Sequence, residues 1–264
     1  MSSNIEFARN ISLNEAAKLV RHVGDSATIL IEGHMGSGKS SILKLLAAQL
    51  PEHYTAYFVM TNLDLGDLQL PAVQHEHRET EFYPNALFGM RNKKPGIFMF
   101  DELGKASRPV QNACLPILLE RRVGLQRMVE GSLVFATTNL GTEGVGDMLQ
   151  AHARNRMVVV SMRKPTADEW IDDFAVAAGI MPEVIAWVRE TPQVMHGFED
   201  VEKPDDNPYI FHPKAQRTAF VTPRSLEKAS DVLKKREFLD EDTVIHALKG
   251  TVGERAALDL RSFV

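Results

Sequence analysis

The residues whose types and spacing are most specific for chemistry are residues 33–40, which read GHMGSGKS. Glycines allow the backbone to fold closely around a phosphate chain, and successive N–H groups at the start of a helix supply a positive field for it. A lysine at the place of Lys39 reaches the β- and γ-phosphates, and the hydroxyl of Ser40 binds magnesium. The spacing therefore predicts a nucleoside-triphosphate site. Its residues are Gly33, His34, Met35, Gly36, Ser37, Gly38, Lys39, Ser40 and Ser41.

The segments on either side of this loop are typical of the strand and helix that hold such a loop. Residues 28–32, which read TILIE, form a short apolar run with β-branched side chains and predict a buried parallel strand. Residues 41–50 place apolar side chains at helical spacing, and Pro51 ends the pattern. A strand before and a helix after favour a phosphate-binding loop over a glycine-rich turn with a chance lysine.

An acidic pair, Asp101 and Glu102, closes the apolar run of residues 96–100. We expect this strand to lie beside the strand that precedes the loop, so that Asp101 joins Ser40 in the magnesium shell. Glu102 would polarise a water molecule in line with the γ-phosphate, as a general base. Asp and Glu are also common in helix caps. The loop motif makes the catalytic interpretation the better one.

Another apolar run, residues 133–138, ends at Asn139. A neutral amide at the end of a buried strand can hydrogen-bond the attacking water or the γ-phosphate. An Asn that begins a turn before Gly141 explains the same residue equally well. The strand alone therefore leaves both interpretations open.

The composition limits the class of protein. The 264 residues are 44% hydrophobic, enough for a sizeable core, and 30 basic against 35 acidic side chains give a net charge of −5. This balance does not favour wholesale binding of nucleic acid, although a local basic patch is compatible with it. The one cysteine, Cys114, lies in an apolar helical run and is expected in the core. Without a signal peptide or an apolar run of about 18 residues, we expect a soluble cytoplasmic protein with no membrane partner.

The order of the elements predicts two domains. Between residues 26 and 160, five short apolar runs alternate with helical or loop segments, which is typical of a doubly wound α/β sheet. Residues 61–95 have mixed polarity and several prolines, and we expect loops and short pieces there. After Pro165 only helical patterns follow. We therefore predict an α/β nucleotide-binding domain over residues 1–164 and a small all-α domain over residues 165–264.

Two capping boxes mark the starts of helices. Ser12 is followed by Glu15, and Thr166 by Glu169, in each case at the start of an apolar pattern with helical spacing. In a capping box the two side chains satisfy backbone N–H groups at the start of a helix reciprocally. We therefore expect helices to begin after Ser12 and after Thr166.

In this order, these residues resemble the AAA+ ATPases, and among them the MoxR-type group that includes CbbQ, NorQ, GvpN and phage relatives. The similarity covers roughly residues 12–262. It departs from many relatives at residues 104–105, which read GK here and NR there. The segments that carry it are FDEL (100–103), QNA (111–113), LERRVG (119–124), ATTN (136–139), DEW (168–170) and PRSL (223–226).

The resemblance implies a P-loop AAA+ domain with a five-stranded parallel sheet, followed by a small all-α lid domain. It implies hydrolysis of ATP with Mg²⁺ as the cofactor. Asp101 and Glu102 correspond to the Walker B pair. Asn139 corresponds to sensor 1, and Arg224 in the lid corresponds to sensor 2.

The resemblance also implies an assembly. Arg156 matches the arginine finger, which in this family reaches the nucleotide of the neighbouring subunit, and Arg154 is the alternative. A finger supplied by a neighbour implies a homo-oligomeric ring, most simply a hexamer, in which a lone subunit is a poor enzyme. Residues around 63–88 and 121–132 would hold the helix-2 insert and the pre-sensor-1 hairpin, both facing the ring pore.

The molecule on which the ring acts is not fixed by these residues, and more than one function stays open. The resemblance favours a chaperone-like ring that remodels or activates a protein client, often through a partner with a von Willebrand factor A domain. The alternative is an AAA+ motor acting on nucleic acid, such as a phage replication or packaging accessory. The basic residues Arg121, Arg122 and Arg127 keep it open. A third interpretation is a small-molecule P-loop kinase. The combination of Asn139, Arg156 and Arg224 argues against it.

Overall fold

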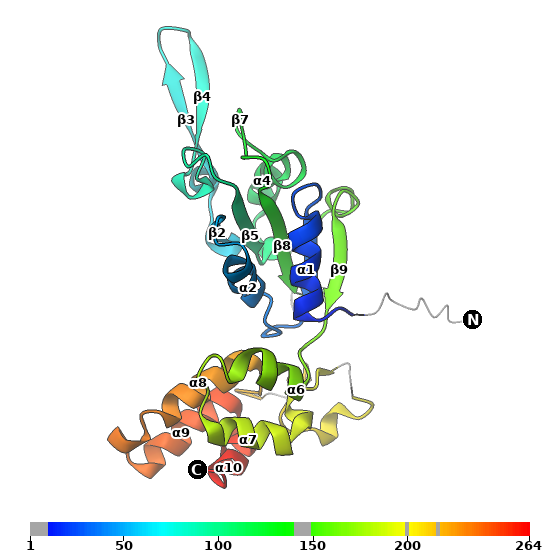
Figure 1. The fold of residues 1–264 in the computed structure, drawn as a ribbon, viewed down its shortest axis with the longest axis vertical. Coiled ribbons are helices and arrows are strands. Elements are labelled where there is room, and N and C mark those ends of the chain that lie inside the picture. Colours follow the sequence, from blue (N-terminus) through cyan, green and yellow to red (C-terminus); the bar gives the residue numbers. More distant parts are fainter. Residues whose placement is uncertain (1–9, 140–148, 199–200, 215–216) are drawn as a thin grey trace, which may run out of the picture. The chain divides into compact units, whose positions relative to one another are not determined.

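The computed structural model describes residues 10–139, 149–198, 201–214 and 217–264, whose fold is shown in Figure 1. The chain forms two compact units. The first, called here the sheet unit, comprises Met1–Met35 and Lys39–Arg163. The second, the helical unit, comprises Gly36–Gly38 and Lys164–Val264.

A five-stranded parallel sheet forms the centre of the sheet unit, with the strand order β2-β5-β8-β1-β9. The apolar runs of the sequence are these strands, and the predicted α/β fold is confirmed. β5 is buried along its whole length, as expected for a parallel strand covered on both faces. The strands are β1 (Ile29–Gly33), β2 (Tyr54–Val59), β5 (Gly96–Asp101), β8 (Leu133–Asn139) and β9 (Val158–Met162).

The position of β5 corrects one expectation. β5 does not lie beside β1, because β8 pairs with both strands and lies between them. The composition of a buried parallel strand is much the same at any central place in a sheet, so the local sequence does not encode the order. The consequence is that Asn139, at the end of β8, lies between the phosphate-binding loop and the acidic pair.

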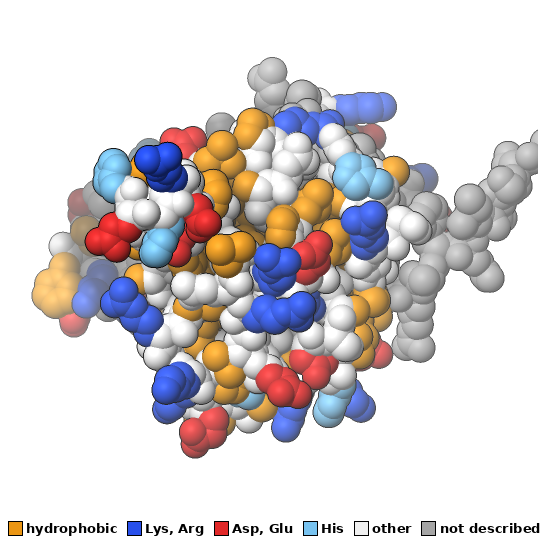
Figure 2. Space-filling view, turned by 90° about the horizontal axis from the view of Figure 1, so that it is seen from above, with side chains coloured by type: hydrophobic (Ala, Val, Ile, Leu, Met, Phe, Trp, Pro, Cys, Tyr) orange, Lys and Arg blue, Asp and Glu red, His pale blue; other side chains and the backbone are white. Residues whose placement is uncertain are grey.

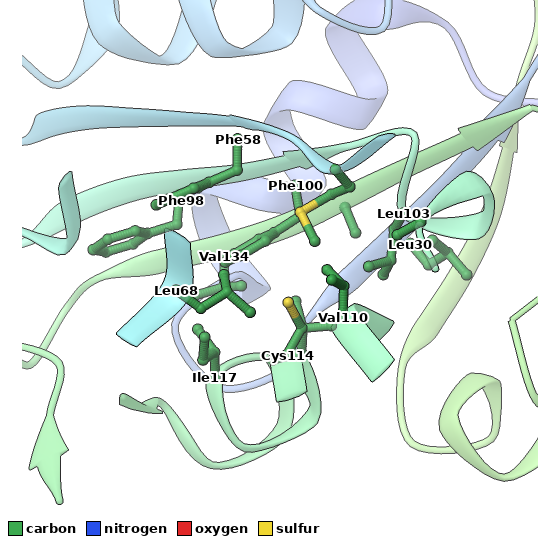
Figure 3. Close-up of a cluster of buried hydrophobic side chains, with 14 of the residues drawn as sticks. Leu30, Phe58, Leu68, Phe98, Phe100, Leu103, Val110, Cys114, Ile117 and Val134 are labelled. Carbon is green, nitrogen blue, oxygen red and sulfur yellow. The ribbon is translucent and has the colours of Figure 1, made fainter. Parts of the chain in front are cut away.

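Helices cover both faces of the sheet. On one face, α1 (Leu13–Val23) and α2 (Ser41–Gln49) share a buried cluster with Ile29 and Ile31. On the other face lie α4 (Arg108–Glu120) and α3 (Leu65–Leu68), with Leu30 in the cluster. Alternate residues of β1 thus enter opposite clusters, as the pleat of a strand requires. Figure 3 shows Val110, Cys114 and Ile117 of α4 beside Phe98, Phe100 and Val134 of the strands.

Two hairpins project from the sheet unit at the end away from the carboxyl ends of the strands (Figure 1). The longer joins β3 (Gln69–Gln74) to β4 (Glu79–Pro84), and the shorter joins β6 (Arg122–Val123) to β7 (Gln126–Arg127). The turn of the shorter hairpin lies against the base of the longer one: a Cβ at Gly124 would come within 3.1 Å of the Gln69 side-chain oxygen. We call the exposed apolar side chains of both hairpins the hairpin surface. They are Leu70, Val73, Phe82, Tyr83 and Leu125.

The expectation of loops over residues 61–95 is wrong for β3 and β4. Pro71 and Pro84 are two of the prolines that favour loops in this segment, yet both lie within paired strands. A two-stranded ribbon consists of edge strands only, and an edge strand tolerates a residue without an N–H group. The histidines and acid at residues 75–77 stand in the turn of this hairpin. No three His, Cys, Asp or Glu side chains gather into a metal site within the described residues.

The helical unit contains α6 (Ala167–Trp170), α7 (Pro182–Glu190), α8 (Pro223–Leu233), α9 (Glu241–Val252) and α10 (Glu254–Arg261). Its core forms around Trp170 and Trp187, which are both fully buried. The predicted capping box is present, since Thr166 accepts the Glu169 N–H and Glu169 accepts the Thr166 N–H. Where the structure describes the chain, no helix has both the length and the apolar character needed to cross a membrane.

Candidate functional site

The phosphate-binding loop connects β1 to α2, as the sequence predicts. Gly36 and Gly38 have φ angles of 72° and 92°, which residues with a Cβ rarely adopt. The two glycines are therefore needed for the shape of the loop. Ser37 Oγ is buried and has no hydrogen-bond partner among the described residues. A buried hydroxyl without a partner is costly, and a bound ligand oxygen would satisfy it.

Lys39 is placed at the carboxyl edge of the sheet, where β1, β5 and β8 end. Its side chain is only 8% exposed. The Nζ group donates to the backbone oxygens of Gly33 at 2.6 Å and His34 at 2.7 Å, and to Asn139 Oδ1 at 3.0 Å. Gly33 and Asn139 are register partners on β1 and β8. The strand pairing thus brings the predicted phosphate-binding lysine and the predicted sensor amide into contact.

The acidic pair ends β5 at the same edge. Asp101 is buried, and its Oδ2 accepts a hydrogen bond from Tyr57 at 2.6 Å. Its Oδ1 accepts from the Thr137 hydroxyl. Glu102 has a φ angle of 58°, in the left-handed region. Non-glycine residues in that region are uncommon and often lie at functional sites.

The side chain of Glu102 is more accessible than that of Asp101. Lys105 Nζ pairs with Glu102 Oε1 at 2.9 Å, and about a third of each side chain is exposed. Exposed ion pairs are weak because water screens them. The partly exposed carboxylate of Glu102 is suited to activate water, and the buried carboxylate of Asp101 next to it is suited to bind a metal ion.

Ser40 immediately precedes α2, and its side chain makes no capping hydrogen bond to the helix. A helix start with a hydroxyl and free N–H groups suits phosphate and magnesium. The assignment of Mg²⁺ to Ser40 and Asp101 stays a prediction.

The two candidate finger arginines differ in their surroundings. Arg154, at the end of α5 (Ala151–Arg154), forms a two-pronged ion pair with Glu32 of β1, with Nη2 and Oε2 at 3.2 Å. The bond to Glu32 raises the pKa of Arg154 above its ordinary value. The side chain of Arg156 is exposed and makes no hydrogen bond or ion pair to another described residue. The Arg154 side chain is therefore occupied within the chain, whereas the Arg156 side chain is not.

Two other predicted residues have different positions. Arg224 is exposed in the first turn of α8 in the helical unit, where Thr222 and Ser225 form the cap. Its role as sensor 2 stays a prediction. Arg121 does not belong to the exposed basic residues of the shorter hairpin. Its guanidinium donates to Thr28 Oγ1 at 2.8 Å and to Gly24 O at 2.9 Å, and burial lowers its pKa.

Sequence reasoning missed three residues that contact the site. Thr137 binds Asp101, and it could have been suspected because it lies two residues before Asn139, on the same face of the strand. Tyr57 binds Asp101 from β2, and the unknown strand order concealed it. Glu32 is an acid in an otherwise apolar strand, which is a visible signal for a buried ion pair.

The geometry agrees with comparisons to known proteins. The model of the AAA domain (dynein-related subfamily) matches residues 28–173. A solved structure from Cytophaga hutchinsonii, described as an ATPase candidate, is 13% identical with a TM-score of 0.46 over 95% of this chain and 89% of that chain. No curated protein matches the sequence. The family match spans more than half of the chain, from the start of β1 into the first turns after the sheet. The chain belongs to the AAA domain family, in its dynein-related subfamily.

Proposed function

We propose that this chain binds ATP with Mg²⁺ at the carboxyl edge of its sheet and hydrolyses it to ADP and phosphate. The observation that carries the proposal is the placement of Lys39. Its buried ammonium group faces neutral oxygens of Gly33, His34 and Asn139. A buried lysine at the start of a helix, directly after a glycine-rich loop, is the arrangement that binds the β- and γ-phosphates of a triphosphate. The unpartnered hydroxyl of Ser37 supports the same ligand.

In this proposal each residue has a separate task. Lys39 binds the β- and γ-phosphates by a charge-assisted contact. Ser40 and Asp101 would hold Mg²⁺, which neutralises phosphate charge when bound. Glu102 accepts the proton of the attacking water, because its partly exposed carboxylate follows directly after the metal-binding Asp101 in the chain. Asn139 orients that water or the γ-phosphate from the neighbouring strand.

A test of this function compares two lysines of the same region. Lys39→Ala should weaken ATP binding by at least about tenfold, because the charge-assisted contact is lost. Lys44→Ala is the matched control, since Lys44 is an exposed residue of α2. Fluorescence titration with an ATP analogue and a phosphate-release assay give both readouts. Equal ATP affinity in the two variants would contradict the assignment of the loop.

We propose further that the active form is a homo-oligomeric ring, most simply a hexamer, in which Arg156 completes the site of the next subunit. Its exposed guanidinium has no partner among the described residues, whereas the nearby Arg154 is occupied by Glu32. A planar, permanently charged fork suits the developing charge of a γ-phosphoryl group. Sedimentation of the protein with ATP tests the assembly, and a monomer at all concentrations would contradict it.

As the client of this ring we propose a protein, as in the MoxR-type group, with a von Willebrand factor A domain protein as a possible partner class. The support is the hairpin surface, on which Val73 is 62% and Leu125 73% exposed. Figure 2 looks onto the end from which the hairpins project and shows hydrophobic side chains among charges of both signs. Such a mixture suits a polypeptide better than a phosphate backbone.

The nucleic-acid motor has one observation in its favour. Arg122 and Arg127 lie opposite each other in the shorter hairpin, which places two cations together. Arg122 lies 3.8 Å from Glu120, which offsets part of that charge. Binding of labelled single-stranded DNA at low and moderate salt distinguishes the candidates. Strong, salt-dependent binding that Arg127→Ala abolishes would favour the motor over the protein-remodelling ring.

A further inference from the structure

We propose that Thr137 is a positioning residue that fixes the metal-binding Asp101 and the water-activating Glu102 relative to each other. This inference rests on the proposed function, since it concerns the same site. Thr137 is completely buried, and its Oγ1 touches both members of the acidic pair. It would act through these two residues and not on the nucleotide itself.

The hydrogen bonds of Thr137 use its hydroxyl in two ways. Oγ1 accepts the backbone N–H of Glu102 at 3.2 Å and donates its own proton to Asp101 Oδ1. A threonine hydroxyl has one proton to donate and two lone pairs. Its single proton is therefore committed to Asp101, while a lone pair holds Glu102. One buried atom thus connects the carboxylate of the first acid to the backbone of the second.

The backbone of Glu102 requires such a connection. Its φ angle of 58° is unfavourable for a residue with a Cβ, and such conformations persist only where the surroundings hold them. The Glu102 carbonyl accepts the Lys105 N–H at 2.9 Å, and the Glu102 N–H is held by Thr137. The side-chain pair with Lys105 is partly exposed, so solvent can replace it. Thr137, whose own side chain is completely buried, supplies the side-chain hydrogen bond to the Glu102 N–H.

The strand order makes Thr137 a link between the two halves of the site. Thr137 and Asn139 lie on the same face of β8. The first binds the acidic pair, and the second binds Lys39. Tyr57, on β2 at the other side of β5, donates a hydrogen bond to the second oxygen of Asp101. A change at Thr137 should therefore disturb both acids, whereas loss of the Tyr57 hydroxyl leaves the Thr137 bond to the Glu102 N–H in place.

The experiment removes the hydroxyl group of Thr137 while the shape of the side chain is kept. Thr137→Val keeps the branched side chain and loses both hydrogen bonds, whereas Thr137→Ser keeps them. Removing a partner of a metal-binding residue typically costs about 10–100-fold in metal affinity or activity. In Thr137→Val we expect kcat to fall by about that factor, and the Mg²⁺ concentration for half-maximal nucleotide binding to rise. Thr137→Ser should remain within about threefold of the parent in both.

Thr138→Val is the matched control, because Thr138 is the next residue of β8 and its hydroxyl makes no hydrogen bond among the described residues. It should behave as the parent does. Tyr57→Phe should raise the Mg²⁺ requirement of binding with a smaller loss of kcat than Thr137→Val, because Glu102 stays held. Circular dichroism and thermal unfolding verify that each variant is folded.

Two results would overturn the proposal. The first is a folded Thr137→Val protein with the kcat and Mg²⁺ dependence of the parent. The second is a Thr137→Ser protein as impaired as Thr137→Val, since packing of the methyl group would then explain the loss. If Thr137→Val does not fold, Thr137→Ser and Thr137→Ala differ by the hydroxyl and repeat the comparison. A parent that binds Mg²⁺-nucleotide without hydrolysing it would contradict the proposed reaction, and the Mg²⁺ dependence of binding would still decide the role of Thr137.

Discussion

The carboxyl edge of the sheet and the hairpin surface are two ends of one unit with opposite chemistry. At the carboxyl edge, polar side chains are buried and bound to one another, as Lys39 is to Asn139 and Thr137 is to Asp101. On the hairpin surface, large apolar side chains such as Val73 and Leu125 are exposed.

This difference distinguishes an end whose polar side chains are already paired within the chain from an end whose apolar side chains are left exposed. Buried polar groups that already have partners form a prepared site whose geometry the fold maintains. Exposed apolar side chains gathered on a projecting ribbon are typical of a surface that another molecule covers. α4 joins the two ends, since it begins shortly after Glu102 and ends at the shorter hairpin. We therefore expect chemistry and client binding to be separable by mutation.

The largest effect should come from Arg156, an exposed residue that we assign to the chemistry. Arg156→Ala should lower turnover by about 10³-fold or more while leaving ATP binding intact, because a finger acts on the transition state. Mixing this variant with Glu102→Gln should restore part of the activity, since some interfaces then combine an intact Glu102 with an intact Arg156. Normal hydrolysis by Arg156→Ala alone, or mixed rings without any activity, would show that the site needs no neighbour.

Glu102→Gln should have the next largest effect. The amide keeps the shape of the side chain and loses the base, so we expect turnover to fall by about 10²–10⁴-fold with ATP still bound. Glu130→Gln, at an exposed position between β7 and β8, is the control. Stopped-flow measurement of phosphate release gives the rate. Comparable rates in the two variants would remove Glu102 from its assigned role.

A variant of the hairpin surface tests whether client binding can be lost without loss of the chemistry. Replacing Val73 and Phe82 together by Ser should leave unfolding free energy within about 1 kcal/mol and basal turnover within about twofold, because both side chains are exposed. Binding of a permanently unfolded polypeptide, measured by fluorescence anisotropy, should weaken several-fold. Loss of basal turnover in this variant would mean that the two ends are not separable.

The smallest effect is expected for ATP on the reactivity of Cys114, which lies in α4, the helix that joins the two ends. Burial raises the pKa of the Cys114 thiol to about 12, so at pH 8 only about one thiol in ten thousand is ionised. Thiolate-dependent labelling of the folded protein should therefore be very slow at pH 8, and it should accelerate on unfolding. ATP should change the rate by less than about twofold if α4 is a rigid link. Rapid labelling induced by ATP would show that α4 opens when the site fills.

The sequence by itself determined the local elements and the identity of the central residues. The glycine spacing of residues 33–40 predicts a phosphate-binding loop, and the loop stands between the predicted strand and helix. The capping boxes at Ser12 and Thr166 predict helix starts that the structure contains. These signals succeed because they depend on neighbours within a few residues, where backbone geometry and hydrogen bonding are decided locally.

Only the tertiary structure decided which residues meet. The place of β8 between β5 and β1 brings Asn139 to Lys39 and Thr137 to Asp101, across separations of 100 and 36 residues. The pairing of Glu32 with Arg154 likewise joins residues 122 positions apart. Apolar runs of similar composition fit any central position of a parallel sheet, so strand order follows from packing of the whole unit. The strand order determines the neighbours of each catalytic candidate, and it cannot be predicted from the local sequence.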